Sequence, residues 1–279
     1  MTDLTPLETL YDSASGQDVP LPETVSYLYG NLRFPDPTDR PRIISNFVAS
    51  LDGVVALRVP GHEGGGDISG FNQHDRMLMG ILRSMADIVI VGAGTLRSVP
   101  DHLWTAEYIY PPLAEEYRRL RSSLGKEKSP LNVIVSASGN IDPGLRVIKS
   151  GEVPVLIVTT TQGGEQLNRQ SLSPSIKVIA AAESSLLTAS TLLDATYRVH
   201  KSEIILVEGG PQLMGDFLAE RCLDELFLTL APQVAGRDGG PERPGLVSGK
   251  IFAPENPLWG TLLSIKRSES HLFLRYKFE

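Results

Sequence analysis

Two segments of the sequence end an apolar run in glycines, where a ligand could approach the backbone closely. Residues 205 to 218, "ILVEGGPQLMGDFL", place Glu208 and two glycines between an apolar run and Pro211. Residues 87 to 98, "DIVIVGAGTLRS", place two glycines and Thr95 after a similar run. Both patterns are typical of a buried strand, a tight turn and the start of a helix. Because backbone N–H groups and the helix dipole favour anions there, we expect an anionic ligand at each turn.

Neither glycine turn has the GxGxxG fingerprint of dinucleotide-binding folds, and a single glycine at a strand end is more often a plain turn. Two such turns in one sheet nevertheless suggest one extended ligand with more than one anionic group. A dinucleotide has that shape.

The elements that must position these turns alternate between strand and helix. Helical periodicity joins several strand-like runs, for example from Met77 to Met85 and from Leu186 to Tyr197. The alternation predicts an α/β fold, with a mostly parallel central sheet flanked by helices and antiparallel strands at the C-terminal edge. The expected strands are residues 42–50, 87–92, 131–136, 153–160, 175–180, 203–208, 225–232, 261–266 and 271–278.

The chain divides into two parts of unequal size. Residues 1 to 41 are rich in Pro, Asp and Ser and predict an N-terminal arm over a domain of residues 42 to 279. Residues 236 to 245, "GRDGGPERPG", are dense in turn-forming residues and predict a mobile loop.

Composition excludes several classes of protein. The net charge is −7 with 41% hydrophobic residues, which argues against a nucleic-acid partner and allows a substantial core. No apolar run is long enough for a membrane span, and the N-terminus lacks the apolar region of a secretion signal. The single cysteine, Cys222, excludes an internal disulfide. We therefore expect a cytoplasmic protein with no membrane partner.

Three motifs in order give a more specific indication. "NFVASLDGVVA" (46–56), "ADIVIVGAGTLR" (86–97) and the segment from "ILVEGGP" to "APQVAG" (205–236) resemble the riboflavin-biosynthesis pyrimidine reductase family. This family is the C-terminal reductase domain of the bifunctional deaminase-reductase and has a dihydrofolate reductase-like fold. The resemblance covers about residues 42 to 279. It implies an NADPH-dependent oxidoreductase that reduces a ribosylaminopyrimidinone 5′-phosphate by hydride transfer, usually as a homodimer.

The resemblance also implies site residues. Glu208 would position or protonate the substrate, with Asp52 as the second catalytic candidate, and no metal is expected. Cofactor contacts would come from Ala49, Gly92, Gly94, Thr95, Ser136, Gly209, Gly210, Pro211, Gln212, Leu213, Met214, Gly215 and Asp216. Substrate contacts would come from Asn46, Arg83, Leu103 and Glu208. Gly209 and Gly210 resemble a pair of glycines in the dihydrofolate reductase fold. In that fold the peptide bond between the two glycines is cis.

Three of these residues have a simpler interpretation. Glu208 could cap the end of its strand, and Arg83 could be a charge on a helix surface. Asp52 could cap its own turn, because Asp-Gly is a favoured turn pair.

The sequence departs from the family at the substrate side. Asn46 stands where members usually carry a lysine that reaches the substrate, and only Leu103 matches the family's DDPxLxxR signature. "GGGDISG" replaces the SxWIT element. A lost charge-assisted contact to phosphate weakens binding by about 1.5–3 kcal/mol, so cofactor binding is predicted more securely than the substrate. Arg97 and His102 could substitute as phosphate contacts.

Other functions remain open from sequence. An NADPH-dependent reductase of a pterin or dihydrofolate is one alternative, and a non-catalytic cofactor-binding homologue is another. A fused zinc deaminase would need a P-C-x-x-C motif, which one cysteine cannot supply, so we expect a stand-alone reductase domain.

Two further expectations concern the cofactor and assembly. We expect NADPH to bind better than NADH, with Ser138, Thr159 and Thr160 as weak candidates for the 2′-phosphate contact. We expect a homodimer, because residues 225–232 and 271–279 would form an apolar sheet edge that needs covering.

Overall fold

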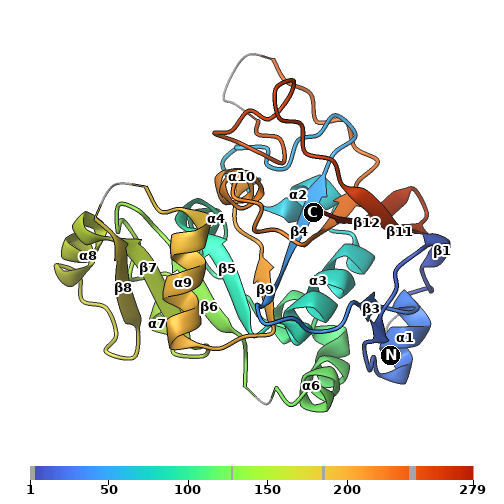
Figure 1. Cartoon of the computed structure of the whole chain (residues 1–279), viewed down its shortest axis with the longest axis horizontal. Helices are drawn as coiled ribbons and strands as arrows, with labels where there is room; N and C mark the ends of the chain where they lie inside the picture. The colour runs from blue at the N-terminus through green and yellow to red at the C-terminus, as the bar shows by residue number, and fades with distance from the viewer. Residues whose placement is uncertain (1–3, 127, 184–185, 239–242, 279) are drawn as a thin grey trace.

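A ten-stranded sheet forms the centre of the molecule, and helices cover both of its faces (Figure 1). The structure, a computed structural model, describes residues 4–126, 128–183, 186–238 and 243–278. The loop that was expected to be mobile, at residues 236 to 245, includes residues 239–242, which lie outside the described residues. Within the described ranges, no helix has the length and apolar character needed to cross a bilayer.

The sheet has the order β1-β11-β12-β10-β4-β9-β5-β6-β7-β8. Neighbours from β10 to β8 are parallel, whereas β1, β11 and β12 pair antiparallel. The expected α/β class is confirmed, and each expected strand is present within two residues of its predicted ends. The strands are β1 (Glu8–Asp12), β4 (Arg42–Ala49), β5 (Ile88–Gly92), β6 (Leu131–Val135), β7 (Val155–Thr160), β8 (Lys177–Ala182), β9 (Ile204–Val207), β10 (Glu225–Leu230), β11 (Thr261–Ser268) and β12 (His271–Lys277), with β2 (Gln17–Asp18) and β3 (Arg33–Phe34) in a small separate sheet.

Two hydrophobic cores lie on opposite faces of the sheet, because successive strand residues point to alternate faces. Val89 and Val91 of β5 join the core under α3 (Gln73–Met85) and α6 (Ala114–Ser123). Ile88 and Ile90 join the core under α9 (Ala189–Val199) and α10 (Pro211–Ala219). The shorter helices are α1 (Glu23–Tyr29), α2 (Gly65–Ser69), α4 (Ala93–Ser98), α5 (Ala106–Ile109), η1 (Pro111–Leu113), α7 (Arg146–Lys149) and α8 (Thr161–Asn168).

One expected helix begins later than its periodicity suggested. The apolar pattern began at Leu186, but α9 begins at Ala189, where the side chain of Thr188 accepts a hydrogen bond from the Thr191 N–H. This cap satisfies a backbone donor at the helix start and leaves Leu186 and Leu187 before the helix.

The N-terminal segment supplies the edge strand of the sheet. β1 pairs antiparallel with β11, and α1 buries Val25, Leu28 and Tyr29 against the domain (Figure 1). Further into the sheet, β12 lies between β11 and β10, and β10 lies between β12 and β4, so both are interior strands. The premise that these two strands form an open edge is therefore wrong, and the expected homodimer needs a different argument.

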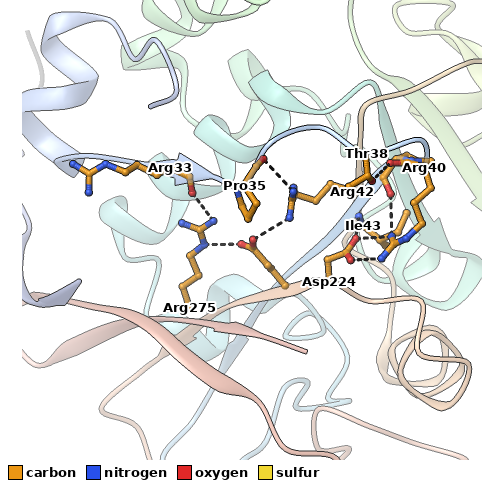
Figure 2. A network of polar contacts seen from close by, with 10 residues as sticks. Arg33, Pro35, Thr38, Arg40, Arg42, Ile43, Asp224 and Arg275 are labelled. Atoms are coloured by element: carbon orange, nitrogen blue, oxygen red, sulfur yellow. Dashed lines mark hydrogen bonds and ion pairs between the residues drawn. The ribbon is translucent and has the colours of Figure 1, made fainter. Parts of the chain in front are cut away.

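Two adjacent acidic residues at the start of β10 contact residues 40 to 43, where the N-terminal segment enters β4 (Figure 2). Asp224 accepts hydrogen bonds from the Arg40 guanidinium and, at 2.7 Å, from the Ile43 N–H. Buried Glu225 accepts from Nε of Arg275 at 2.6 Å and from Arg42 at 3.5 Å. The Glu225–Arg275 pair joins β10 to β12. Because removal of one partner would leave a buried charge unpaired, loss of either side chain would destabilise the protein.

Candidate active site

A cleft of about 1240 Å³ opens where several parallel strands end. Its wall includes Gly92 at the end of β5, Ser136 after β6 and Glu208 after β9, together with Asn46 from within β4. In open α/β sheets ligands bind outside the carboxyl ends of the strands, where the following helices begin. The cleft is thus in the place where the sequence pattern predicted a ligand.

The two glycine turns meet at the centre of this cleft. The Glu208 N–H donates to the Ile90 carbonyl at 3.0 Å, which holds the ends of β9 and β5 together. A β-carbon at Gly209 would lie 2.4 Å from Cδ1 of Leu213 and 3.0 Å from the Gly92 nitrogen, so this approach requires glycine. The bond between Gly209 and Gly210 is trans, since the cis bond of the described chain is Ala253–Pro254.

Gly210 is different, because it leaves open space in the cleft. Its φ of −59° and ψ of 175° are accessible to any residue, and a β-carbon there would lie 3.5 Å from the Thr95 hydroxyl oxygen, an ordinary contact. The cradle formed by Gly210, Thr95 and the start of α10 therefore has room for a ligand group.

Only part of the α10 start faces the cleft. Pro211, Gln212, Leu213 and Asp216 line it, and Asp216 pairs with Lys250 at 3.0 Å. In contrast, Met214 is fully buried in the core. A β-carbon at Gly215 would lie 2.8 Å from the Ser248 carbonyl oxygen, so this glycine allows close packing of the helix against residues 247–250.

Arg83 and Glu208 form a buried ion pair in the wall of the cleft. The Arg83 Nε lies 3.0 and 3.1 Å from the two Glu208 oxygens, and Nη2 lies 2.6 Å from Oε2. The side chains are 1% and 4% exposed, so the interpretation of Arg83 as a helix-surface charge is wrong. Nη1 donates to the carbonyls of Leu103 and Thr105 at 3.4 and 3.2 Å. Leu103 itself is buried and holds Arg83 through its backbone.

Asn46 presents an unused hydrogen-bond acceptor to the same region. The residue is 7% exposed and lines the cleft, and its Oδ1 has no hydrogen-bond partner. Because a buried polar atom without a partner is costly, this oxygen is suited to accept a hydrogen bond from a ligand.

Asp52 lies outside the cleft lining. Its carboxylate accepts hydrogen bonds from the Ser50 hydroxyl at 2.6 Å and from the Ala235 and Gly236 N–H groups at 3.0 and 2.8 Å. These contacts, that of Ser50 first, lower the pKa of Asp52. The placement favours the turn-capping interpretation over a catalytic one. Ala49 is also buried outside the lining, at the end of β4.

Ser136 lines the cleft beside two threonines whose hydroxyl groups already donate hydrogen bonds. The Thr159 hydroxyl donates to the Ser136 carbonyl at 2.6 Å, and the Thr160 hydroxyl donates to the Ala137 carbonyl at 2.7 Å. Both threonines are buried, which leaves Ser138 as the exposed candidate of the three for a 2′-phosphate contact.

His102 and Arg97, the two residues that the sequence suggested as phosphate contacts, differ in charge. His102 packs against the rings of Trp104 and Tyr108, and burial lowers its pKa to about 2, so the imidazole is neutral. Arg97 lines the cleft and is exposed. Only Arg97 of these two can offer a charge-assisted contact.

Sequence reasoning missed a set of cleft residues on α3 and the preceding loop. Asp75 and Met79 line the cleft with Arg83, at spacings of four residues that place all three on one helix face. The spacing of four residues could have identified this face from sequence, because it lies beside the apolar face of the same helix that was recognised between Met77 and Met85. Arg58 and Arg76 also line the cleft.

A sheet whose strand ends and glycine turns open onto one cleft is typical of open α/β proteins, in which ligands bind at this edge of the sheet. Within that class, the chain belongs to the RibD C-terminal domain family, whose model matches residues 41–258.

Individual relatives agree with this family. The chain is 25% identical over 214 residues to a 2,5-diamino-6-ribosylamino-4(3H)-pyrimidinone 5′-phosphate reductase of Aquifex aeolicus, covering 77% of this chain and 85% of that protein. A pyrimidine reductase-like protein of Corynebacterium diphtheriae shares the fold with a TM-score of 0.66 and 22% identity over 86% of this chain and 92% of its own. A deaminase/reductase of Thermotoga maritima shares the fold with a TM-score of 0.63 and 19% sequence identity over 86% of this chain. The matched part spans 57% of that longer protein.

Proposed function

We propose that this chain is an NADPH-dependent pyrimidine reductase of riboflavin biosynthesis, acting on a ribosylaminopyrimidinone 5′-phosphate. The observation that carries the proposal is that the glycine turns and the Arg83–Glu208 pair meet in one cleft. Family membership supports the same reaction class.

The residues at the glycine turns fit a dinucleotide. Gly210 leaves open space beside the Thr95 hydroxyl, and the N–H groups at the start of α10 favour a pyrophosphate. Ser136 would lie toward the adenosine end. When bound, NADPH supplies the hydride, and the protein supplies orientation and exclusion of water.

The substrate side would be organised by buried polar groups. Glu208 is held in one orientation by Arg83, and Asn46 Oδ1 can accept a hydrogen bond from a ring or amino N–H. A group held in place before binding loses little entropy on reaching the reactive geometry.

Three cleft arginines are available for phosphate groups. Among the described residues, no carboxylate oxygen lies within 4 Å of a side-chain nitrogen of Arg58, Arg76 or Arg97. A guanidinium without a carboxylate partner can bind phosphate with two parallel hydrogen bonds. These arginines would compensate for the missing arginine of the family signature.

The test is oxidation of NADPH, followed by absorbance, with the ribosylaminopyrimidinone phosphate and with dihydrofolate as separate substrates. Turnover of the first supports the proposal. Turnover of dihydrofolate alone would indicate a pterin reductase, and tight NADPH binding with no oxidation would indicate a non-catalytic homologue.

A further inference from the structure

Asp75 is a buried carboxyl group of the cleft to which the proposed reaction gives no role. It lies in the first turn of α3 and is 4% exposed. Its N–H donates to the Asn72 side chain at 3.0 Å, which caps the helix. Two helical turns separate it from Arg83 on the face that lines the cleft. The helix that positions the Arg83–Glu208 pair therefore also presents Asp75 to a ligand.

Asp75 differs from the other buried or half-buried carboxylates of the cleft because it has no cationic partner. Glu208 pairs with Arg83 and Asp216 with Lys250, and Asp67 lies 2.7 Å from a ring nitrogen of His62. In the described part of the chain, no lysine, arginine or histidine nitrogen lies within 4 Å of the Asp75 carboxylate.

The surroundings of Asp75 come from four elements. Burial is the largest influence and raises the pKa of Asp75 to about 6. The Thr229 hydroxyl of β10, the Ser69 hydroxyl of α2, and the nearby His271 of β12 and Arg76 of α3 oppose this rise. At neutral pH the carboxylate is thus ionised and poorly solvated, a state that N–H donors from a ligand would stabilise.

A second acceptor lies on the same face of the sheet. Thr229 pairs with Val48 in the parallel ladder of β10 and β4. Asn46 precedes Val48 by two residues, so its side chain points to the same face. The unpartnered Asn46 Oδ1 and the Asp75 carboxylate both accept hydrogen bonds and line the same cleft. This wall fits a ligand edge that is rich in N–H donors.

We propose that Asp75 binds the guanidine-like edge of a 2-aminopyrimidin-4-one and so selects a diaminopyrimidinone substrate over the corresponding uracil. The inference rests on the proposed function and specifies its substrate class. The 2-amino group and the ring N–H beside it donate in parallel, as an arginine fork does to a carboxylate. A uracil presents a carbonyl oxygen at position 2, which would face the carboxylate without a hydrogen bond.

The experiment compares kcat/KM for 2,5-diamino-6-ribosylaminopyrimidinone 5′-phosphate and 5-amino-6-ribosylaminouracil 5′-phosphate at neutral pH. We expect the unmodified protein to prefer the diamino compound by at least about tenfold, because a site built for a donor rejects an analogue that lacks it. Asp75→Asn should abolish or reverse this preference through KM, since the asparagine amide can donate to the uracil carbonyl. Glu63→Gln, a change at an exposed carboxyl of the cleft rim, should keep the preference.

A measurement on the unmodified protein gives an independent answer, including the case in which Asp75→Asn fails to fold. Protonated Asp75 can donate to the uracil carbonyl, so the KM for the uracil compound should fall as the pH is lowered through about 6. Equal kcat/KM for both compounds in the unmodified protein would overturn the selection while leaving the reductase function intact. Equal loss of kcat for both compounds in Asp75→Asn, at unchanged KM, would make Asp75 a proton donor instead. Reduction of neither compound would overturn the proposed function and the selection with it.

Discussion

The carboxylate of Glu208 accepts three hydrogen bonds from Arg83, and both side chains line the cleft although they are almost fully buried. Glu208 therefore has two roles that an experiment must separate. It neutralises a buried guanidinium, which concerns stability, and it lies beside the glycine turn, which concerns chemistry.

Glu208→Gln should lower turnover by at least about tenfold, corresponding to roughly 1.4 kcal/mol in the barrier, with near-normal NADPH affinity. It should also destabilise the protein by about 3 kcal/mol, because Arg83 loses its charged partner. Steady-state kinetics and thermal denaturation check the two effects. Glu225→Gln is the matched control, since Glu225 is equally buried beside Arg275 but lies outside the cleft lining. If Glu208→Gln lost stability like the control and kept full turnover, the carboxylate would be a structural partner only.

Gly210→Val should leave the protein folded and abolish NADPH binding. Its backbone angles suit valine, and the added side chain would fill the space beside Thr95 where a pyrophosphate would lie. Titration by protein fluorescence can follow binding, because Trp104 lines the cleft. Gly209→Ala is the contrasting variant and should lower the melting temperature, since its β-carbon would meet the Gly92 backbone at 3.0 Å. Unaltered NADPH affinity in Gly210→Val would exclude this turn as the cofactor site.

Titration of the unmodified protein by fluorescence should also show tighter binding of NADPH than of NADH.

Asp75→Asn should stabilise the folded protein at neutral pH. The pKa of Asp75 is raised from 3.8 to about 6, so its contribution to stability is fully present below pH 3.8 and is lost as the pH rises through 6. Asparagine does not titrate, and two pKa units correspond to roughly 3 kcal/mol at most. Denaturation of both proteins between pH 4 and 8 should show the variant gaining on the unmodified protein as the pH rises. A difference that does not vary with pH would mean that Asp75 is not desolvated in the folded state.

We expect a homodimer, although the reason differs from the one that the sequence suggested. The sheet edge is covered by β1, whereas Val234, Ile251 and Trp259 are 72%, 90% and 83% exposed. A contiguous exposed apolar patch marks an interface, so we expect these side chains to contribute to the contact between the two copies. Sedimentation at micromolar concentration should give about twice the chain mass, and Ile251→Asp should shift the equilibrium toward monomer. A single-chain mass for the unmodified protein would rule out the dimer.

The features that were predictable from sequence are those encoded locally. The runs that became β5 and β9 are short and apolar and lead into glycine turns, so their strands, turns and helix starts could be placed within one or two residues. Features that depend on distant parts of the chain could not be predicted. Asp52 accepts hydrogen bonds from backbone N–H groups 183 and 184 residues away. β1 has no alternation of apolar and polar residues from which its pairing with β11 could be predicted.

The site residues show the same division. Gly209 and Glu208 were recognisable because a motif contains them, whereas Asp75 belongs to no motif and is defined by what surrounds it. Periodicity identified the buried face of α3 from Met77 and Leu78. Only the folded structure, which brings Thr229 of β10 beside α3, shows that Asp75 is buried, and in the described part of the chain it has no ion-pair partner.

The measurement that tests the proposed hydride transfer most directly is the fate of a deuterium label. NADPH carrying deuterium at the nicotinamide C4, prepared in each of its two stereochemical forms, is incubated with the ribosylaminopyrimidinone phosphate, and the product is examined by mass spectrometry and NMR. We expect one labelled form to transfer its deuterium to the former C1 of the ribose, giving a ribitylamino product, and the other form to transfer none. A ribitylamino product that contains no deuterium from either form, or NADPH consumption without that product, would contradict the assignment of this cleft to direct hydride transfer.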